Sequence, residues 1–216
     1  MKSSSRSRRS FTGRRRRVAA TEATLKSIKH LVTPQMMIMD VGSTKVDVVQ
    51  AARSALRDQI GSFVPAHPIT GKEVAGVEHA DVNLYQGAQV ILTPTERTLT
   101  AHLSRAQALW EALGCHVQAM SPEAHDSALA TVSHLPHLTA FALMHSILHQ
   151  DAAADTLSLG GSGFRDFTRI AAASPEMWRD VCLNNREAIL HDLDVYLAHA
   201  QQLRDKIAAS DADGIL

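Results

Sequence analysis

Two patterns of apolar residues divide this chain of 216 residues, and they constrain its fold more than any other feature. Within residues 18–120, short continuous apolar runs of strand length alternate with stretches whose apolar residues recur at helical spacing. After Met120 the strand-like runs stop, and the remainder contains only helical patterns. The sequence therefore predicts an α/β part followed by an all-helical part.

The strand-like runs predict a mostly parallel sheet, because fully apolar runs bordered by helices are typical of strands covered on both faces. The four expected strands are residues 36–41, 63–69, 90–94 and 116–120. Helices are expected between them, over 21–32 with Thr21 as N-cap, over 43–60 with a Ser/Thr cap, and over 95–114 with Gly114 as C-cap.

The second part of the chain is expected to be helical almost throughout. Residues 121–150 predict one long helical stretch, interrupted near Pro136. The Gly-rich segment 151–163 predicts a loop, after which residues 164–210 return to helical spacing with Ser174 as an internal N-cap.

The first 17 residues differ from the rest in charge. They hold eight of the 22 Lys and Arg residues and no acid, so residues 18–216 carry a net charge of about −8. Such a leader suits a nucleic-acid-binding arm, a targeting segment or a disordered tail without a function. No nucleic-acid-binding fold accompanies the arginines, so we expect a basic disordered leader and no nucleic-acid partner.

Two further features bound the cellular setting. No apolar run approaches the roughly 18 residues that a membrane span needs, so no membrane partner is expected. Cys115 and Cys182 are far apart and match no metal-ligand spacing. This usage indicates a reducing compartment, the cytoplasm, rather than a disulfide framework.

The segment DVGSTK, residues 40–45, is the first candidate for chemistry. An apolar strand that runs into Gly42, Ser43 and a helix places a hydroxyl and free backbone N–H groups at the carboxyl edge of the sheet. Ligands of α/β proteins bind at that edge. A helix N-cap with no ligand has the same pattern, and the residues alone leave both interpretations open.

In the next strand-like segment, FVPAHPITGKEVAGVE at residues 63–78, the apolar run breaks at Pro65 and His67 follows the break. An imidazole in the same crevice as Ser43 could accept a proton from a hydroxyl near neutral pH. Lys72 and Glu73 are close enough in sequence to tune it. The alternative is a loop histidine without a role.

The helical part contributes further histidines. His134 and His137 stand three residues apart, and His145 and His149 stand four apart. Both pairs lack a nearby Glu or Cys to complete a ligand set, so no metal is expected. His137 is interpreted instead as a polar residue that lines a substrate cleft.

Two arginines, Arg165 and Arg169, lie four residues apart on one predicted helix face, with Asp166 between them. A guanidinium is suited to bidentate recognition of a carboxylate, and it is equally suited to an ion pair within the protein.

Four segments in this order resemble the prephenate/arogenate dehydrogenase family of tyrosine biosynthesis. They are DVGSTK, then HPITGKEVAGVEHA with LYQGAQVILTPT, then SHLPHLTAFAL, and then GFRDFTRIAAASPEMWRDVCLNN. The resemblance covers roughly residues 18–200. It implies the C-terminal part of a Rossmann-like NAD(P)-binding domain over 18–120, a helical substrate-binding and dimerisation domain over 121–216, and a homodimer.

The resemblance also implies a reaction, in which hydride transfer to NAD or NADP is coupled to loss of a ring carboxylate as CO2. The substrate is prephenate, giving 4-hydroxyphenylpyruvate, or arogenate, giving tyrosine. By position, His67 is implied to be the catalytic histidine that bonds the ring 4-hydroxyl, and Ser43 its partner on the same hydroxyl. Arg169 is implied to hold a substrate carboxylate, His137 to line the pocket, and Glu73 to gate the cleft.

The chain departs from the family pattern in one respect. Members of the family begin with a strand, a GxGxxG turn and a helix, and this pattern is not found before the first segment that resembles the family. The Gly-rich segment that is present, with Gly160, Gly161 and Gly163, lies between two helical patterns, which is the wrong context for a dinucleotide-binding loop. We therefore expect the N-terminal dinucleotide-binding segment to be lacking and NAD to bind weakly or not at all. The function is then that of a prephenate dehydrogenase, of an arogenate-using one, or of a non-catalytic dimerising remnant.

Overall fold

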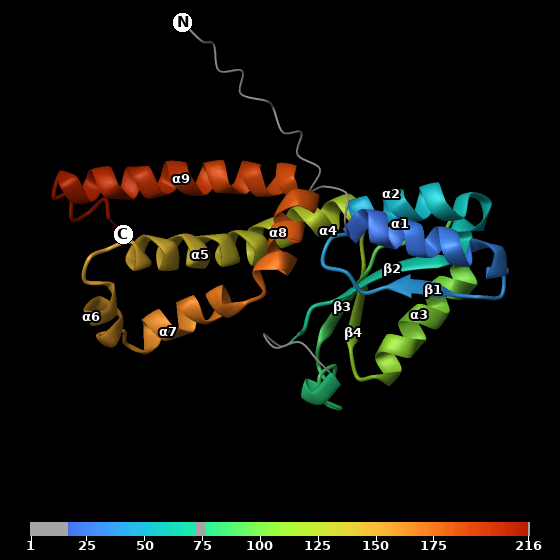
Figure 1. Cartoon of the computed structure of the whole chain (residues 1–216). Helices are drawn as coiled ribbons and strands as arrows, with labels where there is room; N and C mark the ends of the chain where they lie inside the picture. The colour runs from blue at the N-terminus through green and yellow to red at the C-terminus, as the bar shows by residue number, and fades with distance from the viewer. Residues whose placement is uncertain (1–16, 72–76, 216) are drawn as a thin grey trace, which may run out of the picture.

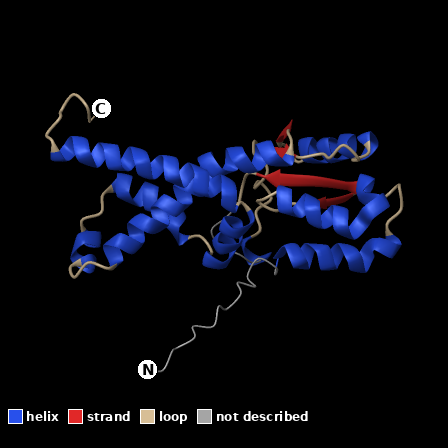
Figure 2. Cartoon of the chain, turned by 90° about the horizontal axis from the view of Figure 1, so that it is seen from above, coloured by secondary structure: helices blue, strands red, loops and turns tan. Residues whose placement is uncertain are grey.

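The structure is a computed structural model, and it describes residues 17–71 and 77–215. The expectation for the basic leader concerns residues 1–17, of which all but Arg17 lie outside the described residues. The described part has an α/β portion at one end and a bundle of helices at the other (Figures 1 and 2).

Four strands form one sheet in the order β1-β2-β3-β4. They are β1 (Ile38–Asp40), β2 (Phe63–Pro68), β3 (Gln89–Leu92) and β4 (His116–Ala119). The β1–β2 and β3–β4 pairs are parallel, whereas β2 and β3 are antiparallel. The mostly parallel sheet is thus confirmed, with one antiparallel pair inside it. That pair is possible because no α-helix lies among the described residues between β2 and β3, and a parallel pair needs a crossover.

The two faces of the sheet are covered by different helices (Figure 1). One face packs beneath α1 (Arg17–Ile28) and α2 (Val46–Leu56), and α3 (Thr100–Ala112) covers the other. Side chains of β2 alternate between these layers: Phe63 belongs to the core under α1 and α2, and Val64 to the core on the α3 side. His67 shares its face with Phe63.

The chain between these elements contains short 3-10 helices, η2 (Lys29–Leu31), η3 (Arg57–Ser62) and η4 (Val77–His79). Leu113 is the C-cap of α3, and Gly114 directly after it has a φ of 85°, so the glycine predicted to end this helix does so from the next position. Thr21 was expected to cap its helix, but α1 begins at Arg17 and Thr21 lies inside it.

The helical part begins directly after β4. Its elements are α4 (Pro122–Leu129), η5 (Ala130–His134), α5 (Leu135–Leu148), α6 (Ala153–Ser158), α7 (Ser162–Thr168), η6 (Arg169–Ala172), α8 (Pro175–Asn184) and α9 (Arg186–Ala208). In Figure 1, α5 and α9 run alongside each other away from the sheet, and α7 lies below α5.

Two details of the helical part differ from the sequence-based expectation, and a third agrees with it. The interruption near Pro136 is a π-helical turn, η5, that precedes the proline, and Pro136 occupies the first turn of α5, where its missing N–H is harmless. The expected loop 151–163 contains the short helix α6, with the sequence AADTLS. Ser174 does cap α8, since its hydroxyl accepts the Met177 N–H.

The start of α2 also differs from the sequence-based expectation. No Ser or Thr side chain caps it; instead the carboxylate of Asp126, from α4, accepts the N–H groups of Lys45 (2.8 Å) and Val46 (2.9 Å). An anion at a helix N-terminus satisfies donors that the helix leaves open and complements its dipole. The helical part therefore supplies the cap of an α/β helix.

Among the described helices, none is long and apolar enough to cross a membrane.

Candidate active site

The candidate site is built around His67, which lies within β2 rather than after it. The strand continues through Pro65, whose carbonyl accepts the Thr93 N–H at 2.9 Å. The last residue of β1, Asp40, pairs with Pro65, and the last residue of β3, Leu92, pairs with Ala66. Two strand ends thus converge on the residues just before His67.

A buried lysine supports this convergence. Lys45 is fully buried, and its ammonium group donates to Asp40 and to the Ala66 carbonyl, the latter at 2.7 Å. The other Asp40 carboxylate oxygen accepts the Ala66 N–H at 3.2 Å. Burial lowers the pKa of Lys45, and the contact with Asp40 opposes that shift. The pair holds the loop after β1 against the segment that carries His67.

His67 is hydrogen-bonded to a histidine of the helical part. Its Nδ1 lies 2.8 Å from Nε2 of His125, and Nδ1 of His125 lies 2.7 Å from Oδ1 of Asp126. His125 is completely buried and Asp126 is 4% exposed. The three side chains therefore form one continuous hydrogen-bonded chain from β2 to α4, with Asp126 also capping α2.

The environment keeps His67 neutral. Burial is the main reason that its pKa falls to about 3, and the nearby His125, Lys45 and His134 lower it further. The same effect of burial lowers the pKa of His134 to about 4, with Asp126 opposing it. Two neutral imidazoles near each other can accept hydrogen bonds at physiological pH.

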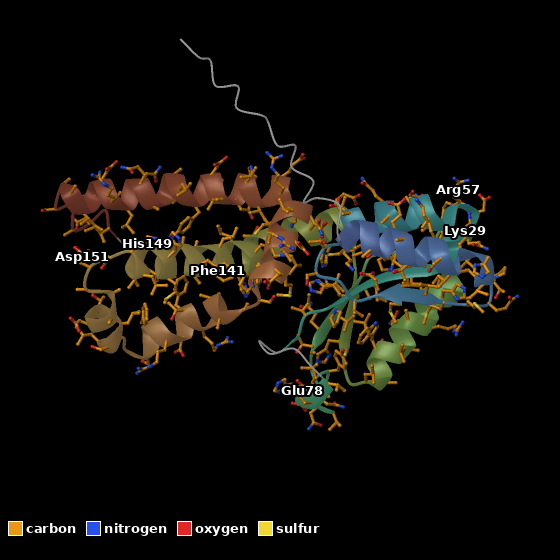
Figure 3. All side chains as sticks on the ribbon, in the orientation of Figure 1. Lys29, Arg57, Glu78, Phe141, His149 and Asp151 are labelled. Carbon is orange, nitrogen blue, oxygen red and sulfur yellow. The ribbon has the colours of Figure 1, made fainter. Side chains whose placement is uncertain are left out.

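A second group of side chains surrounds Trp178 of α8. His137 stacks on its ring at a centroid distance of 3.8 Å, and His134 meets it edge-on at 5.8 Å. Phe141, one turn further along α5 (Figure 3), also meets Trp178 edge-on, at 6.2 Å. The buried indole N–H of Trp178 has no acceptor among the described residues.

The remaining predicted residues lie around these two groups. Arg169 is exposed in η6 and close enough to His137 to help burial lower the pKa of that histidine. Ser43 lies in the loop after β1 and lines a cavity of about 180 Å³ together with Asp40, Gly42 and Thr44. Glu73 lies outside the described residues. The structure thus brings His67 close to His134, and His137 close to Arg169, with Trp178 between the two histidines of the helical part.

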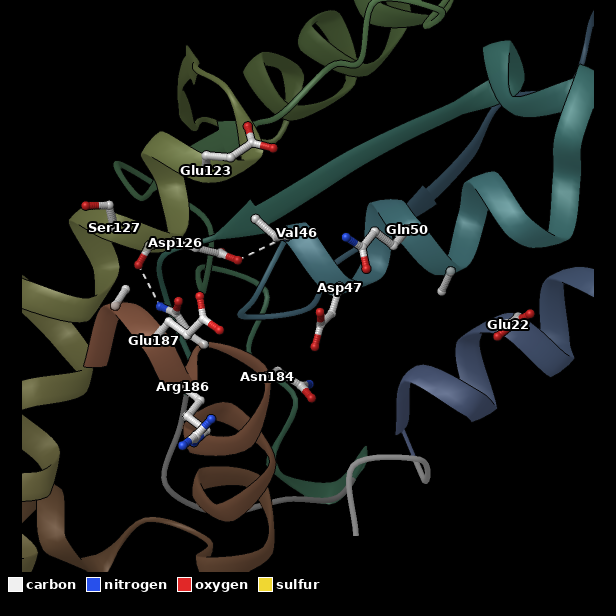
Figure 4. Close-up of a pocket in the computed structure, with 13 residues that line it drawn as sticks. Glu22, Val46, Asp47, Gln50, Glu123, Asp126, Ser127, Asn184, Arg186 and Glu187 are labelled. Carbon is white, nitrogen blue, oxygen red and sulfur yellow. Dashed lines mark hydrogen bonds between the residues drawn. The ribbon is translucent and has the colours of Figure 1, made fainter. Parts of the chain in front are cut away.

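A larger cavity, of about 750 Å³, lies elsewhere (Figure 4). It is lined by residues of α1, α2, α4, α8 and α9, and its carboxylates are those of Glu22, Asp47, Glu123, Asp126 and Glu187. Arg186 is the single cation among its described lining residues. This lining would repel a dianionic ligand, so the volume of the cavity does not make it the site for one.

His125 and Asp126 were missed in the sequence, although His134 and His137 were considered. The available signal was an adjacent His-Asp pair in the second turn of a helix that directly follows a strand. The pair matters because His125 contacts His67, which is 58 positions earlier, and Asp126 contacts Lys45, which is 81 positions earlier. The spacing of residues along the sequence does not reveal contacts at this separation.

No group of three or more His, Cys, Asp or Glu side chains within residues 17–71 and 77–215 could hold a metal ion. His145 and His149, whose ring centroids lie 4.1 Å apart, belong to no such group.

Comparison with solved structures relates the fold of this chain to known proteins. The chain superimposes on prephenate dehydrogenase from A. aeolicus, in complex with hydroxyphenyl propionate and NAD+, with a TM-score of 0.83. The two are 36% identical, and the match covers 92% of this chain and 68% of that one. The chain belongs to the prephenate dehydrogenase family. Family models agree: the nucleotide-binding domain of prephenate dehydrogenase matches residues 17–119, and its dimerization domain matches residues 121–216.

Other members of the family are similar over most of the chain. Prephenate dehydrogenase of Bacillus subtilis is 34% identical over 200 residues, which are 92% of this chain and 54% of that protein. Cyclohexadienyl dehydrogenase of Zymomonas mobilis is 36% identical over 183 residues, 84% of this chain and 62% of that protein. The chain thus spans between half and two thirds of these relatives.

The family membership and the fold class expected from the sequence are therefore confirmed. The roles of Ser43, His67, Glu73, His137 and Arg169 are not tested by these comparisons and remain predictions.

Proposed function

We propose that this chain acts in the oxidative decarboxylation of prephenate to 4-hydroxyphenylpyruvate with NAD(P)+, a step of tyrosine biosynthesis. The observation that carries the proposal is His67, a neutral imidazole at the junction of the two parts, near the row that runs from His134 through Trp178 and His137 to Arg169. A proton acceptor at one end and a cation at the other suit a substrate with a ring hydroxyl and carboxylates.

In this proposal His67 acts on the ring 4-hydroxyl. It accepts the hydroxyl proton while hydride leaves C4 of the ring, so that the C–O bond becomes a carbonyl. The bond between the ring and its carboxylate then breaks, and its electron pair aromatises the ring and reduces the carbonyl to a phenolate. The phenolate recovers the proton from His67, and CO2 leaves. Ser43 is proposed to hydrogen-bond the same hydroxyl and to orient it toward His67.

The other predicted residues are proposed to hold the substrate. Arg169 binds a carboxylate of the substrate through its guanidinium, which can donate two parallel hydrogen bonds. His137, fixed by its stacking on Trp178 and by a 2.9 Å bond from Nδ1 to the Ser133 carbonyl, lines the pocket. Glu73 gates the cleft.

The cofactor fits only in part. The cavity next to Ser43 lies at the carboxyl end of β1, where α/β sheets bind nucleotides, and Gly42 and Thr44 also border it. Its volume of about 180 Å³ is below the roughly 300–1,000 Å³ of a typical ligand pocket, so these residues would contact one end of a dinucleotide. NAD or NADP, when bound, supplies a hydride acceptor.

A second copy of the chain is proposed as a partner. On α9, a stripe at helical spacing is buried at Ile189, half-buried at Leu193, and exposed at Tyr196, Leu203 and Ile207. The stripe that packs in the core near Ile189 thus continues beyond it without cover from the described residues. Because residues 121–216 match a dimerization domain, we propose that the same stripe of a second copy of the chain covers this surface. The two copies then form a homodimer through the helical part. Two free cysteines, Cys115 and Cys182, favour the cytoplasm as its location.

The test is reduction of NAD+ or NADP+ by the purified chain with prephenate, followed at 340 nm. His67→Asn is expected to lower kcat by about 10²–10⁴-fold, the usual contribution of a general base. His149→Asn, at the exposed end of α5, is the control and should leave kcat unchanged. Equal rates for His67→Asn and the unmodified chain would refute the role of His67. Absence of any turnover would favour the non-catalytic remnant, and turnover of arogenate alone would favour the arogenate-using enzyme.

A further inference from the structure

The hydrogen bonds that link Asp126, His125 and His67 also determine which ring nitrogen of each histidine carries the proton. Asp126 receives three donors on two oxygens: Lys45 N–H and His125 Nδ1 on Oδ1, and Val46 N–H on Oδ2. Two of these donors are backbone groups at the N-terminus of α2, which stabilise a negative charge. Asp126 is therefore an ionised carboxylate and can only accept hydrogen bonds.

The direction of each bond follows from that starting point. Since Asp126 accepts, Nδ1 of His125 carries the proton and donates it. In a neutral imidazole the other nitrogen is then an acceptor, so Nε2 of His125 accepts the hydrogen bond from Nδ1–H of His67. His67 in turn is left with its proton on Nδ1 and a lone pair on Nε2.

Charges around the two hydrogen-bonded rings, His125 and His67, favour their neutral forms. The ammonium group of Lys45 and the ring of His134 lie near His67, and a second positive charge between them would be unfavourable. Burial of His125 adds to that cost, and the α2 N–H groups already compensate the charge of Asp126.

We propose that His125 and Asp126 are positioning residues that fix the tautomer of His67, with the proton on Nδ1 and Nε2 free to accept. This assignment rests on the proposed function for its role in turnover, but the tautomer itself does not. The hydrogen bond of the His67 ring to the described residues uses Nδ1, which leaves Nε2 to accept a substrate proton. When Nε2 takes that proton, the positive charge on His67 faces Asp126 through the polarised ring of His125.

The assignment makes a sharp prediction for Asp126→Leu, which is close to the native side chain in size and accepts no hydrogen bond. Nδ1–H of His125 then loses its buried acceptor, and an unpaired buried N–H is unfavourable. The proton of His125 therefore moves to Nε2, which donates to Nδ1 of His67, and the proton of His67 moves to its own Nε2. The substitution thus reverses the hydrogen bond between the two rings and removes the acceptor.

The test is long-range ¹H–¹⁵N NMR correlation of the histidine rings in the full chain near pH 7, without substrate or cofactor. We expect His67 and His125 to be protonated at Nδ1 in the unmodified chain and at Nε2 in Asp126→Leu. Asp58→Leu, the same substitution at a fully exposed carboxylate, should leave both tautomers unchanged. Asp126→Leu should also lower kcat by about 10²–10⁴-fold with prephenate.

A proton on Nε2 of His67 in the unmodified chain would overturn the proposal, and that measurement needs no variant to fold. Unchanged tautomers in a folded Asp126→Leu variant would overturn it as well. If the tautomers behave as expected and the chain shows no dehydrogenase activity, the assignment stands and the proposed function fails.

Discussion

At the scale of single residues, the site uses buried histidines whose charge has been suppressed. His67 and His134 have pKa values of about 3 and about 4, both well below the ordinary value of 6.5. In the unfolded chain these rings recover ordinary pKa values, so the unfolded state binds more protons as the pH falls below 6.5. The folded state resists protonation because both rings are packed away from water.

This difference predicts how stability depends on pH. Between pH 7.5 and 5.5 the free energy of unfolding should fall, with each ring adding up to about 1.4 kcal/mol per pH unit below pH 6.5. The loss continues toward the folded pKa values, where His67 and His134 become charged. Urea unfolding at several pH values measures the slope.

His67→Asn removes one of the two rings and should flatten that slope, whereas His149→Asn should not. The inference would be wrong if the two variants and the unmodified chain lost stability equally over this range.

The candidate residues were predictable from the sequence only in part. His67 and Ser43 stood out because each follows or ends an apolar run, which places them at one edge of the sheet. His125 and Asp126 did not, because their partners lie across the chain: His125 meets β2, and Asp126 meets the start of α2. A buried lysine such as Lys45 is also hard to foresee, since its burial depends on Asp40 and the Ala66 carbonyl being in place.

At the scale of elements, local signals were reliable where the chain supplies its own partner. Gly114 and Ser174 are such cases, because a positive φ and a hydroxyl cap are determined by neighbouring residues. The predicted Ser/Thr cap of α2 was wrong, and the antiparallel β2–β3 pair was not predicted. Long-range packing decides both features. The π-helical turn η5 likewise has no marker in its sequence ATVSH.

Gly114 allows a test at this scale. Gly114→Ala should lower the free energy of unfolding by about 1–2 kcal/mol, because a side chain at φ 85° is strained. The added Cβ would also meet the amide end of Gln86, a flexible group that can move aside. Gly161→Ala, where a Cβ meets nothing within 4 Å, is the matched control and should change stability by less than about 0.5 kcal/mol. Equal stability of both variants in urea unfolding would show that the strain is relieved.

At the scale of the whole molecule, the helical part presents more apolar surface than its own packing covers. Tyr196, Leu203 and Ile207 are each at least 43% exposed on one stripe of α9. Exposed apolar stripes of this kind are typical of interfaces between chains.

We therefore expect the chain to sediment at twice its mass of 23.4 kDa, and the double variant Leu203→Glu/Ile207→Glu to sediment as a monomer. Burying carboxylates in an apolar interface is strongly unfavourable. Leu109→Glu, on α3 of the α/β part and 45% exposed, has a similar starting exposure and should leave the mass unchanged. A monomeric unmodified chain, or a double variant that still forms dimers, would contradict the proposed interface.

The π-helical turn between α4 and α5 has a further consequence for the whole molecule. Each residue of a helix advances the rotation about its axis by about 100°, so one extra residue in a turn sets the angular phase of everything that follows. His125 faces β2 before η5, and His137 faces Trp178 after it. A single deletion in η5, for example of the exposed Val132, would leave both helices intact yet turn His137 and Phe141 away from Trp178. The mutual orientation of the two parts is thus encoded in a residue count as well as in side chains.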